Sequence, residues 1–262
     1  MFLAVYLLAG ACAGLVAGLF GVGGGIVVVP VLVVVFESQG FNSEILTHMA
    51  IGTSLATIVF TSFSSVLNHH RLGSVDWQIF KPMSAGIVLG AVIGVVTVLQ
   101  LDGELVKKLI GGFAIFVAFK MFLQSARVPT KDVPRGYAVM APVGVFVGWV
   151  SSIFGIGGGT LTVPFLSRYN LEMKKVVGTA AACGLPIAIA GALTNVALGI
   201  GLPNRPEWSL GYVYIPALLG IALASTYFAK VGAKLAHRLP ADILKKLFSV
   251  TLFAVGLKFL FF

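Results

Sequence analysis

Two glycine-rich segments hold the residues of this chain that are best suited to bind a ligand. They span Gly18–Pro30 and Ser152–Pro164, and each contains Phe-Gly-X-Gly-Gly-Gly followed at the same interval by a proline. Clustered glycines are poor helix formers, so each segment predicts a break in a helix. A helix that starts after such a break presents backbone N–H groups with no partner inside the helix, and these favour an anion. The candidate binding glycines are Gly23, Gly24, Gly25, Gly157, Gly158 and Gly159.

Two other interpretations of the glycine segments are weaker. Small residues also let membrane helices pack closely, which is the better explanation for a single cluster. Two matching clusters favour a functional break, because broken helices at corresponding positions of a repeated chain mark the binding sites of transporters. A phosphate-binding loop would end in Lys-Ser or Lys-Thr, and this ending follows neither cluster.

Polar residues form a stripe in the segment that follows the first glycines. They recur every three or four residues, which places them on one helical face, as Thr53, Thr57, Thr61, Ser64 and Asn68. Such a face can line a wet path, or its hydroxyls can donate back to carbonyls of their own helix. Outside the glycines, the candidate binding residues are Thr53, Ser54, Asn68, Thr160, Thr179 and Asn195.

Titratable residues are scarce inside the apolar segments. The carboxylates lie at predicted helix ends or in loops, unlike the buried pairs that many proton or sodium carriers use. His69 and Arg71 end the polar helix, where they could attract an anion or relay a proton, or simply lie at the interface. No catalytic or metal-ligating arrangement stands out, and Cys12 and Cys183 stand alone in apolar surroundings. We expect no enzyme activity, no metal and no cofactor.

The composition indicates that the helices carrying these residues lie in a membrane. The chain is 58% hydrophobic and only 10% charged, whereas a soluble domain carries about 25% charged residues. Apolar runs long enough for a membrane helix recur at Thr47–Leu67, Ile79–Leu99, Leu105–Leu123, Val176–Ile200, Gly211–Lys230 and Ile243–Phe262. The basic residues behind the net charge of +9 lie in the loops between them, so the charge indicates membrane topology better than nucleic-acid binding, and we expect no nucleic-acid partner. The fold class is an all-α integral membrane protein.

The chain is predicted to contain two copies of one unit. Besides the glycine segments, Gly52-Thr53 matches Gly178-Thr179, and two Leu-X-Lys-Lys-Leu-like segments recur near the ends. We predict a first repeat over 1–125, a cytoplasmic linker over 126–135 and a second repeat over 136–262. The segment Phe2–Phe36 would be about 50 Å long as one helix, against about 30 Å of hydrocarbon, so it should fold back as a hairpin. Each repeat then adds three membrane-spanning helices, giving about eight helices, or about ten with each broken half counted.

Loop charge favours this hairpin arrangement. If each hairpin returns to its own side, the two repeats are inverted, and only Lys107, Lys108, Arg205 and Lys258 of the 18 Lys and Arg residues fall on one side. Counting each hairpin as one crossing gives a nearly even split. The positive-inside rule therefore predicts inverted repeats, with both termini outside the cell and the linker in the cytoplasm.

The paired glycine motifs, Gly52-Thr53-Ser54 and Gly178-Thr179-Ala180 resemble the sulfite exporter TauE/SafE family over essentially the whole chain. The resemblance implies an inner-membrane protein that exports sulfite, sulfoacetate or another organosulfonate. The positions that match the family motif are the two glycine clusters, Thr53, Ser54 and Thr179. Ala180 stands where the first copy has Ser54, so the contacts of the two copies should differ.

These observations together predict a secondary transporter that exports a small anion by alternating access. Its partners would be the anion, the lipid bilayer and protons as coupling ion, and a homo-oligomer stays open. The alternatives are an anion channel and a membrane assembly factor without transport activity.

Overall fold

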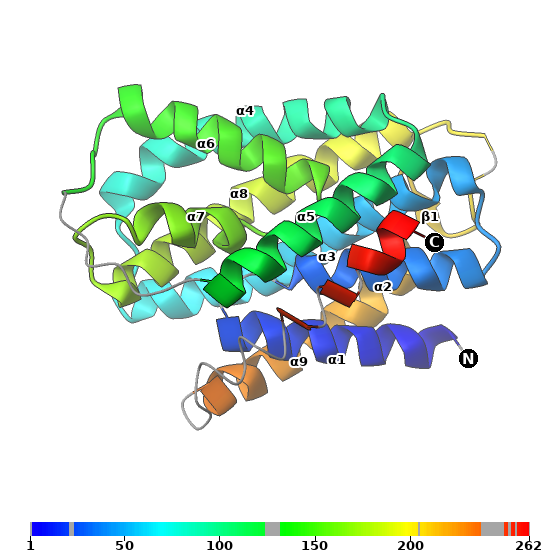
Figure 1. The fold of residues 1–262 in the computed structure, drawn as a ribbon, viewed down its shortest axis with the longest axis horizontal. Coiled ribbons are helices and arrows are strands. Elements are labelled where there is room, and N and C mark those ends of the chain that lie inside the picture. Colours follow the sequence, from blue (N-terminus) through cyan, green and yellow to red (C-terminus); the bar gives the residue numbers. More distant parts are fainter. Residues whose placement is uncertain are drawn as a thin grey trace.

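The computed structural model describes residues 2–20, 24–123, 132–203, 205–236, 249–250, 253–254 and 256–261. Nearly all of them are helical (Figure 1). The labelled elements are α1 (Phe2–Phe20), α2 (Gly25–Ser38), α3 (Ser43–Arg71), α4 (Trp77–Leu99), α5 (Gly103–Leu123), α6 (Tyr137–Ile153), α7 (Gly159–Leu166), α8 (Met173–Gly199), β1 (Ser209–Leu210), β2 (Val213–Tyr214) and α9 (Ile215–Ala236). The prediction of an all-α membrane protein is confirmed.

Within the described residues, three helices are long and apolar enough to cross a membrane by themselves, namely α3, α4 and α8. Shorter apolar helices occupy Leu3–Leu15, Gly25–Ser38, Tyr137–Ile153 and Ile215–Val231. The helix predicted over 211–230 begins only at Ile215 as α9, because the antiparallel strands β1 and β2 occupy the residues before it. Gly211 turns this hairpin with a φ of 58°, a conformation that glycine adopts without strain. The predicted span over 243–262 lies partly outside the described residues.

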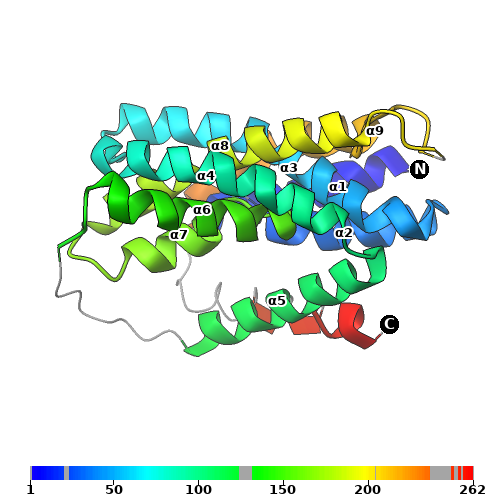
Figure 2. The ribbon, with the colours of Figure 1, turned by 90° about the horizontal axis from the view of Figure 1, so that it is seen from above.

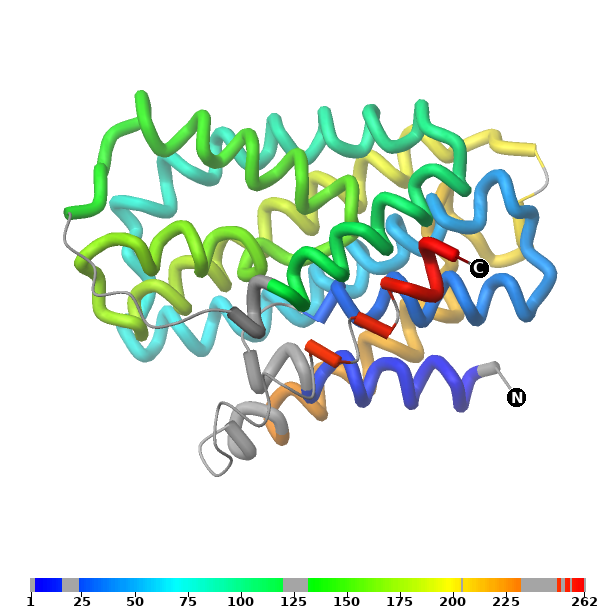
Figure 3. Tube along the Cα trace, in the orientation of Figure 1, coloured from blue at the N-terminus to red at the C-terminus, as the bar shows by residue number. Residues whose placement is uncertain are grey.

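Both long apolar segments break at their glycines. In the first segment, α1 ends at Phe20 and α2 begins at Gly25; in the second, Phe154–Gly158 separate α6 from α7. Gly24 and Gly155 have φ angles of 73° and 62°, which explains why glycine stands there. Figures 1 and 3 show α2 running back toward the end where α1 started, and α7 likewise running back toward the start of α6. Each broken segment is therefore a hairpin.

Close backbone approaches hold the helices together. The pairs α1–α9 and α4–α6 have the most extensive contacts, followed by α3 and α8. On α4, a Cβ at Gly86, Gly90 or Gly94 would overlap the backbone of α6. On α1, Gly10 faces Ile221 of α9, where a Cβ would lie 2.6 Å from the carbonyl oxygen. These glycines allow the tight packing that membrane helices need, since lipid provides no hydrophobic force between them.

The helix α5 lies to one side of this bundle, beside the C-terminal residues (Figure 2). A Cβ at Gly111 would lie 2.9 Å from the carbonyl oxygen of Gly256, so the two segments cross closely. Lys107 donates to Glu37 at 2.7 Å and lies 6.0 Å from the ring of Phe259. This ion pair joins α5 to the end of α2.

Candidate functional site

The start of α2 meets the second helix break inside the protein. A Cβ on Gly25, the first residue of α2, would lie 2.5 Å from the carbonyl oxygen of Gly155 and 2.9 Å from the Cα of Ile156. The hydroxyl of Ser54 on α3 donates to the same Gly155 carbonyl at 2.8 Å. On the other side, the ring of Phe113 on α5 stacks on Phe154 with centroids 4.2 Å apart. The second break is therefore enclosed by α2, α3 and α5.

The helices that begin at these breaks expose their N-termini to the same region. In the described part of the chain, neither Gly24 before α2 nor Gly158 before α7 provides a side-chain cap. Figure 1 shows the two helices starting near the middle of the molecule and running toward opposite ends. Their first N–H groups and the positive ends of their dipoles consequently favour negative charge between them.

Four hydroxyl groups flank the second break, and their oxygens are buried without a hydrogen-bond partner among the described residues. They are Ser151 and Ser152 at the end of α6, and Thr160 and Thr162 at the start of α7. Ser151, Ser152 and Thr162 are 0% exposed. A buried polar group without a partner costs about 1–3 kcal/mol, so these four hydroxyls are candidates for contact with a ligand or an ordered water.

The sequence comparison singled out Thr160 but missed Ser151, Ser152 and Thr162. The first copy has Ala17 and Gly18 where the second has Ser151 and Ser152. Matching the two repeats selects residues that both copies share, so it does not select these serines, which occur in the second copy alone. Two adjacent serines next to a predicted break could have been noticed for their own sake.

Thr53 and Thr179 are buried at contacts with the backbone, away from solvent. The N–H of Tyr214 donates to Thr53 Oγ1 at 3.0 Å, and the N–H of Asp76 donates to Thr179 Oγ1 at 2.9 Å. Thr57 and Thr61 donate to carbonyls of their own helix, at 2.7 and 3.2 Å. Two hydroxyls of the polar stripe, Thr57 and Thr61, thus bond within their own helix, as one of the two predicted alternatives requires.

The two asparagines lie in different environments. Asn195 is fully buried, its Nδ2 donates to Gly191 at 2.8 Å, and its Oδ1 is unpartnered among the residues described. Asn68 is exposed near the end of α3, about 22 Å along the helix from Thr53. The structure therefore does not bring Asn68 together with Thr53.

His69 and Arg71 lie in the last turn of α3. Arg71 is exposed, whereas the Nδ1 atom of His69 is buried with no partner in the described structure. The backbone contacts pair His69 with Asn195, because Ser74 donates to the His69 carbonyl as Tyr212 donates to the Asn195 carbonyl.

The remaining predicted glycines divide between described and undescribed positions. Gly157, Gly158 and Gly159 are buried. A Cβ on Gly158 would lie 2.9 Å from the backbone nitrogen of Gly184 on α8, so glycine is required for this contact. Gly23 lies outside the described residues.

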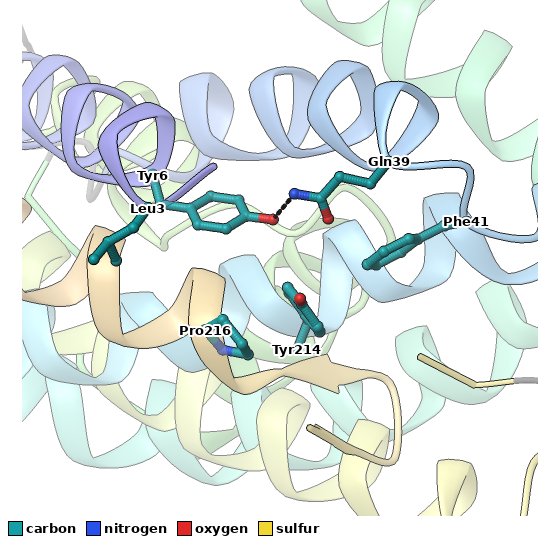
Figure 4. A pocket seen from close by; sticks show the side chains of 6 residues that line it. All are labelled: Leu3, Tyr6, Gln39, Phe41, Tyr214 and Pro216. Atoms are coloured by element: carbon teal, nitrogen blue, oxygen red, sulfur yellow. Dashed lines mark hydrogen bonds between the residues drawn. The ribbon is translucent and has the colours of Figure 1, made fainter. Parts of the chain in front are cut away.

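A separate pocket of about 320 Å³ opens near the start of α1. Figure 4 shows its lining, which comprises Leu3, Tyr6, Gln39, Phe41, Tyr214 and Pro216. Gln39 donates to the Tyr6 hydroxyl at 2.6 Å. Burial raises the pKa of the Tyr214 hydroxyl above its ordinary value. The predicted binding residues do not line this pocket, although Tyr214 connects it to Thr53.

Proteins of known sequence resemble this chain over nearly its whole length. A family model described as "Sulfite exporter TauE/SafE" matches residues 6–259. A "Probable membrane transporter protein" of Haemophilus influenzae is 38% identical over 98% of this chain and 97% of its own length. Another, from Methanocaldococcus jannaschii, is 28% identical over 98% of this chain and 95% of its own length. No solved structure matches the chain.

Proposed function

This chain belongs to the sulfite exporter TauE/SafE family, and from that premise we propose that it exports a small sulfur-containing anion by alternating access. The anion would be sulfite, sulfoacetate or another organosulfonate, and the membrane would be the cytoplasmic membrane. The family and the apolar helices make the protein a multi-pass membrane transporter.

The proposed binding site lies between the two breaks. The observation that carries it is a set of buried hydroxyls that have no partner among the described residues, beside helix N-termini that no described side chain caps. Backbone N–H and hydroxyl groups donate hydrogen bonds, and the oxygens of a sulfite or sulfonate accept them. The site would consist of Gly24, Gly25, Gly157, Gly158, Gly159, Ser151, Ser152, Thr160 and Thr162, with Ser54 holding Gly155 in place.

Alternating access would follow from two inverted repeats, 1–125 and 136–262. In support, α1 packs against α9 as α6 packs against α4, which is the exchange of partners that two equivalent halves would make. Figure 1 also shows α1 and α6 running in opposite directions. Inverted repeats around a central site are a common architecture of secondary transporters. Protons are the coupling ion that we propose.

Reconstitution in liposomes tests the substrate class. Uptake is measured for labelled sulfite, sulfoacetate, sulfate and a carboxylate, with and without a pH gradient. We expect saturable uptake and counterflow of the sulfur oxyanions, which would exclude a simple channel and an assembly factor. The substrate class is wrong if every sulfur oxyanion is inert while the same protein moves another solute.

The variants Ser152→Ala and Thr162→Val test the site itself. Removing an unpartnered buried hydroxyl does not lower stability, because no protein hydrogen bond is lost. We therefore expect an unchanged or higher melting temperature together with at least tenfold slower uptake. Thr194→Val is the matched control, since Thr194 donates to Ala190 of its own helix at 2.7 Å. Normal uptake by both site variants would place the anion elsewhere.

A further inference from the structure

A glycine-threonine pair on α3 holds the hairpin that leads into α9. The N–H of Tyr212 donates to the carbonyl of Asn195 at 3.3 Å. The carbonyl of Tyr212 lies against Gly52, where a Cβ would be only 2.8 Å away. Two residues later, the N–H of Tyr214 donates to Thr53 Oγ1 at 3.0 Å. We call these five residues the Thr53 anchor.

The same three contacts recur around the matching pair on α8. The N–H of Ser74 donates to the carbonyl of His69 at 2.9 Å. The carbonyl of Ser74 lies against Gly178, where a Cβ would overlap it. Two residues later, the N–H of Asp76, the N-cap of α4, donates to Thr179 Oγ1 at 2.9 Å. These five residues form the Thr179 anchor.

The two anchors lie at opposite ends of the helix bundle. Figure 1 shows the β1–β2 hairpin at the end that also holds the N-terminus, and the turn between α3 and α4 at the other end. In each anchor, the threonine accepts from the residue directly before a helix, whose N–H has no partner inside that helix. Each predicted repeat thereby fixes the start of a helix that belongs to the other repeat.

We propose that Thr53 and Thr179 are positioning residues that close the two ends of the transporter, and that they do not bind the substrate. Their hydroxyls are 0% exposed and are already used as acceptors by backbone N–H groups. Opening the end with the N-terminus requires the start of α9 to leave α3, which breaks the Thr53 anchor. Opening the other end breaks the Thr179 anchor. The assignment of ends to access states rests on the proposed alternating access.

Hydrogen–deuterium exchange of the protein in nanodiscs, without substrate, tests the anchors separately from transport. In Thr53→Val, we expect about tenfold faster exchange in the segment 211–214 and no change in 74–76. In Thr179→Val, we expect the reverse pattern. Thr53→Ser keeps the hydroxyl and should restore slow exchange. Thr57→Val is the matched control, since Thr57 is equally buried but donates within α3.

The uptake assay then separates positioning from binding. We expect Thr53→Val and Thr179→Val to change the maximal rate with little change in the KM for sulfite or sulfoacetate. Local exchange that stays slow in both valine variants, with a KM raised at least tenfold, would assign the threonines to substrate binding and overturn the proposal. Slow exchange with normal transport would also overturn it. Failure of sulfite transport leaves the exchange result valid.

Discussion

The hydroxyl groups of this protein fall into two classes at the scale of single residues. Ser54, Thr53 and Thr179 are buried and take part in hydrogen bonds to backbone atoms far away in the chain. Ser151, Ser152 and Thr162 are equally buried and, within the described residues, have no such partner. The first class costs stability when removed and the second does not. Mutation can therefore distinguish structural hydroxyls from those that await a ligand.

Ser54→Ala should destabilise the protein. Its hydroxyl is 0% exposed and donates to the Gly155 carbonyl at 2.8 Å, so its loss removes this hydrogen bond from a carbonyl inside the protein. We expect the free energy of unfolding to fall by about 1–3 kcal/mol. Denaturant unfolding in detergent micelles measures the change. Thr61→Val, which removes a bond within one helix, should change stability by less than about 0.5 kcal/mol. Equal losses in both variants would contradict this argument.

The residue types showed where the backbone would break, but not how each hydroxyl would be used. Gly24 and Gly155 adopt positive φ angles, a conformation that glycine adopts without strain, so the residue type alone indicates the break. The partner of Thr53 is 161 residues away in the chain. The packing of α3 against the β1–β2 hairpin brings Tyr214 near Thr53. The spacing of residues within α3 could not reveal this contact.

Helix packing depends on glycine at the scale of elements. Gly90 of α4 faces α6, and a Cβ there would lie 2.8 Å from the Cα of Val145 and closer still to its carbonyl oxygen. Gly90→Ala should push α4 from α6 and lower stability by about 1–3 kcal/mol. Gly112→Ala on α5 is the control, because no described residue lies within 4 Å of its added Cβ. Alanine is the better helix former, so Gly112→Ala should leave the melting temperature unchanged or raised. Similar losses in both variants would contradict the packing explanation.

Long apolar runs predicted the helices well because length and apolar character decide whether a helix can span a membrane. The run Ile79–Leu99 corresponds closely to α4, and Leu105–Leu123 to α5. The β1–β2 hairpin was not predicted, because each strand has only 2 residues. The apolar sequence of the hairpin also continues into α9 without a clear boundary. Contacts with Gly52 and Asn195 hold it, and these are tertiary.

Charge is unevenly divided at the scale of the whole molecule. Basic residues gather at the end of the bundle where α3 meets α4 and α8 begins, namely Arg71, Arg135, Arg168, Lys174 and Lys175. The opposite end carries Glu37, Glu44 and Glu207 together with Lys107, Lys108 and Arg205, so both signs of charge occur there. A cell retains basic loops on its cytoplasmic side. The sequence predicted this asymmetry only after the hairpins were assumed, because loop charge depends on which segments cross.

Cysteine labelling tests this orientation. In a Cys12→Ser background, Lys174→Cys and Glu207→Cys place one exposed thiol at each end of α8. Because the basic end should face the cytoplasm, we expect a membrane-impermeant maleimide to label Glu207→Cys in intact cells. Lys174→Cys should react only after permeabilisation, and both should react equally in detergent. Labelling of Lys174→Cys alone in intact cells would reverse the orientation. Labelling of both would contradict a single orientation.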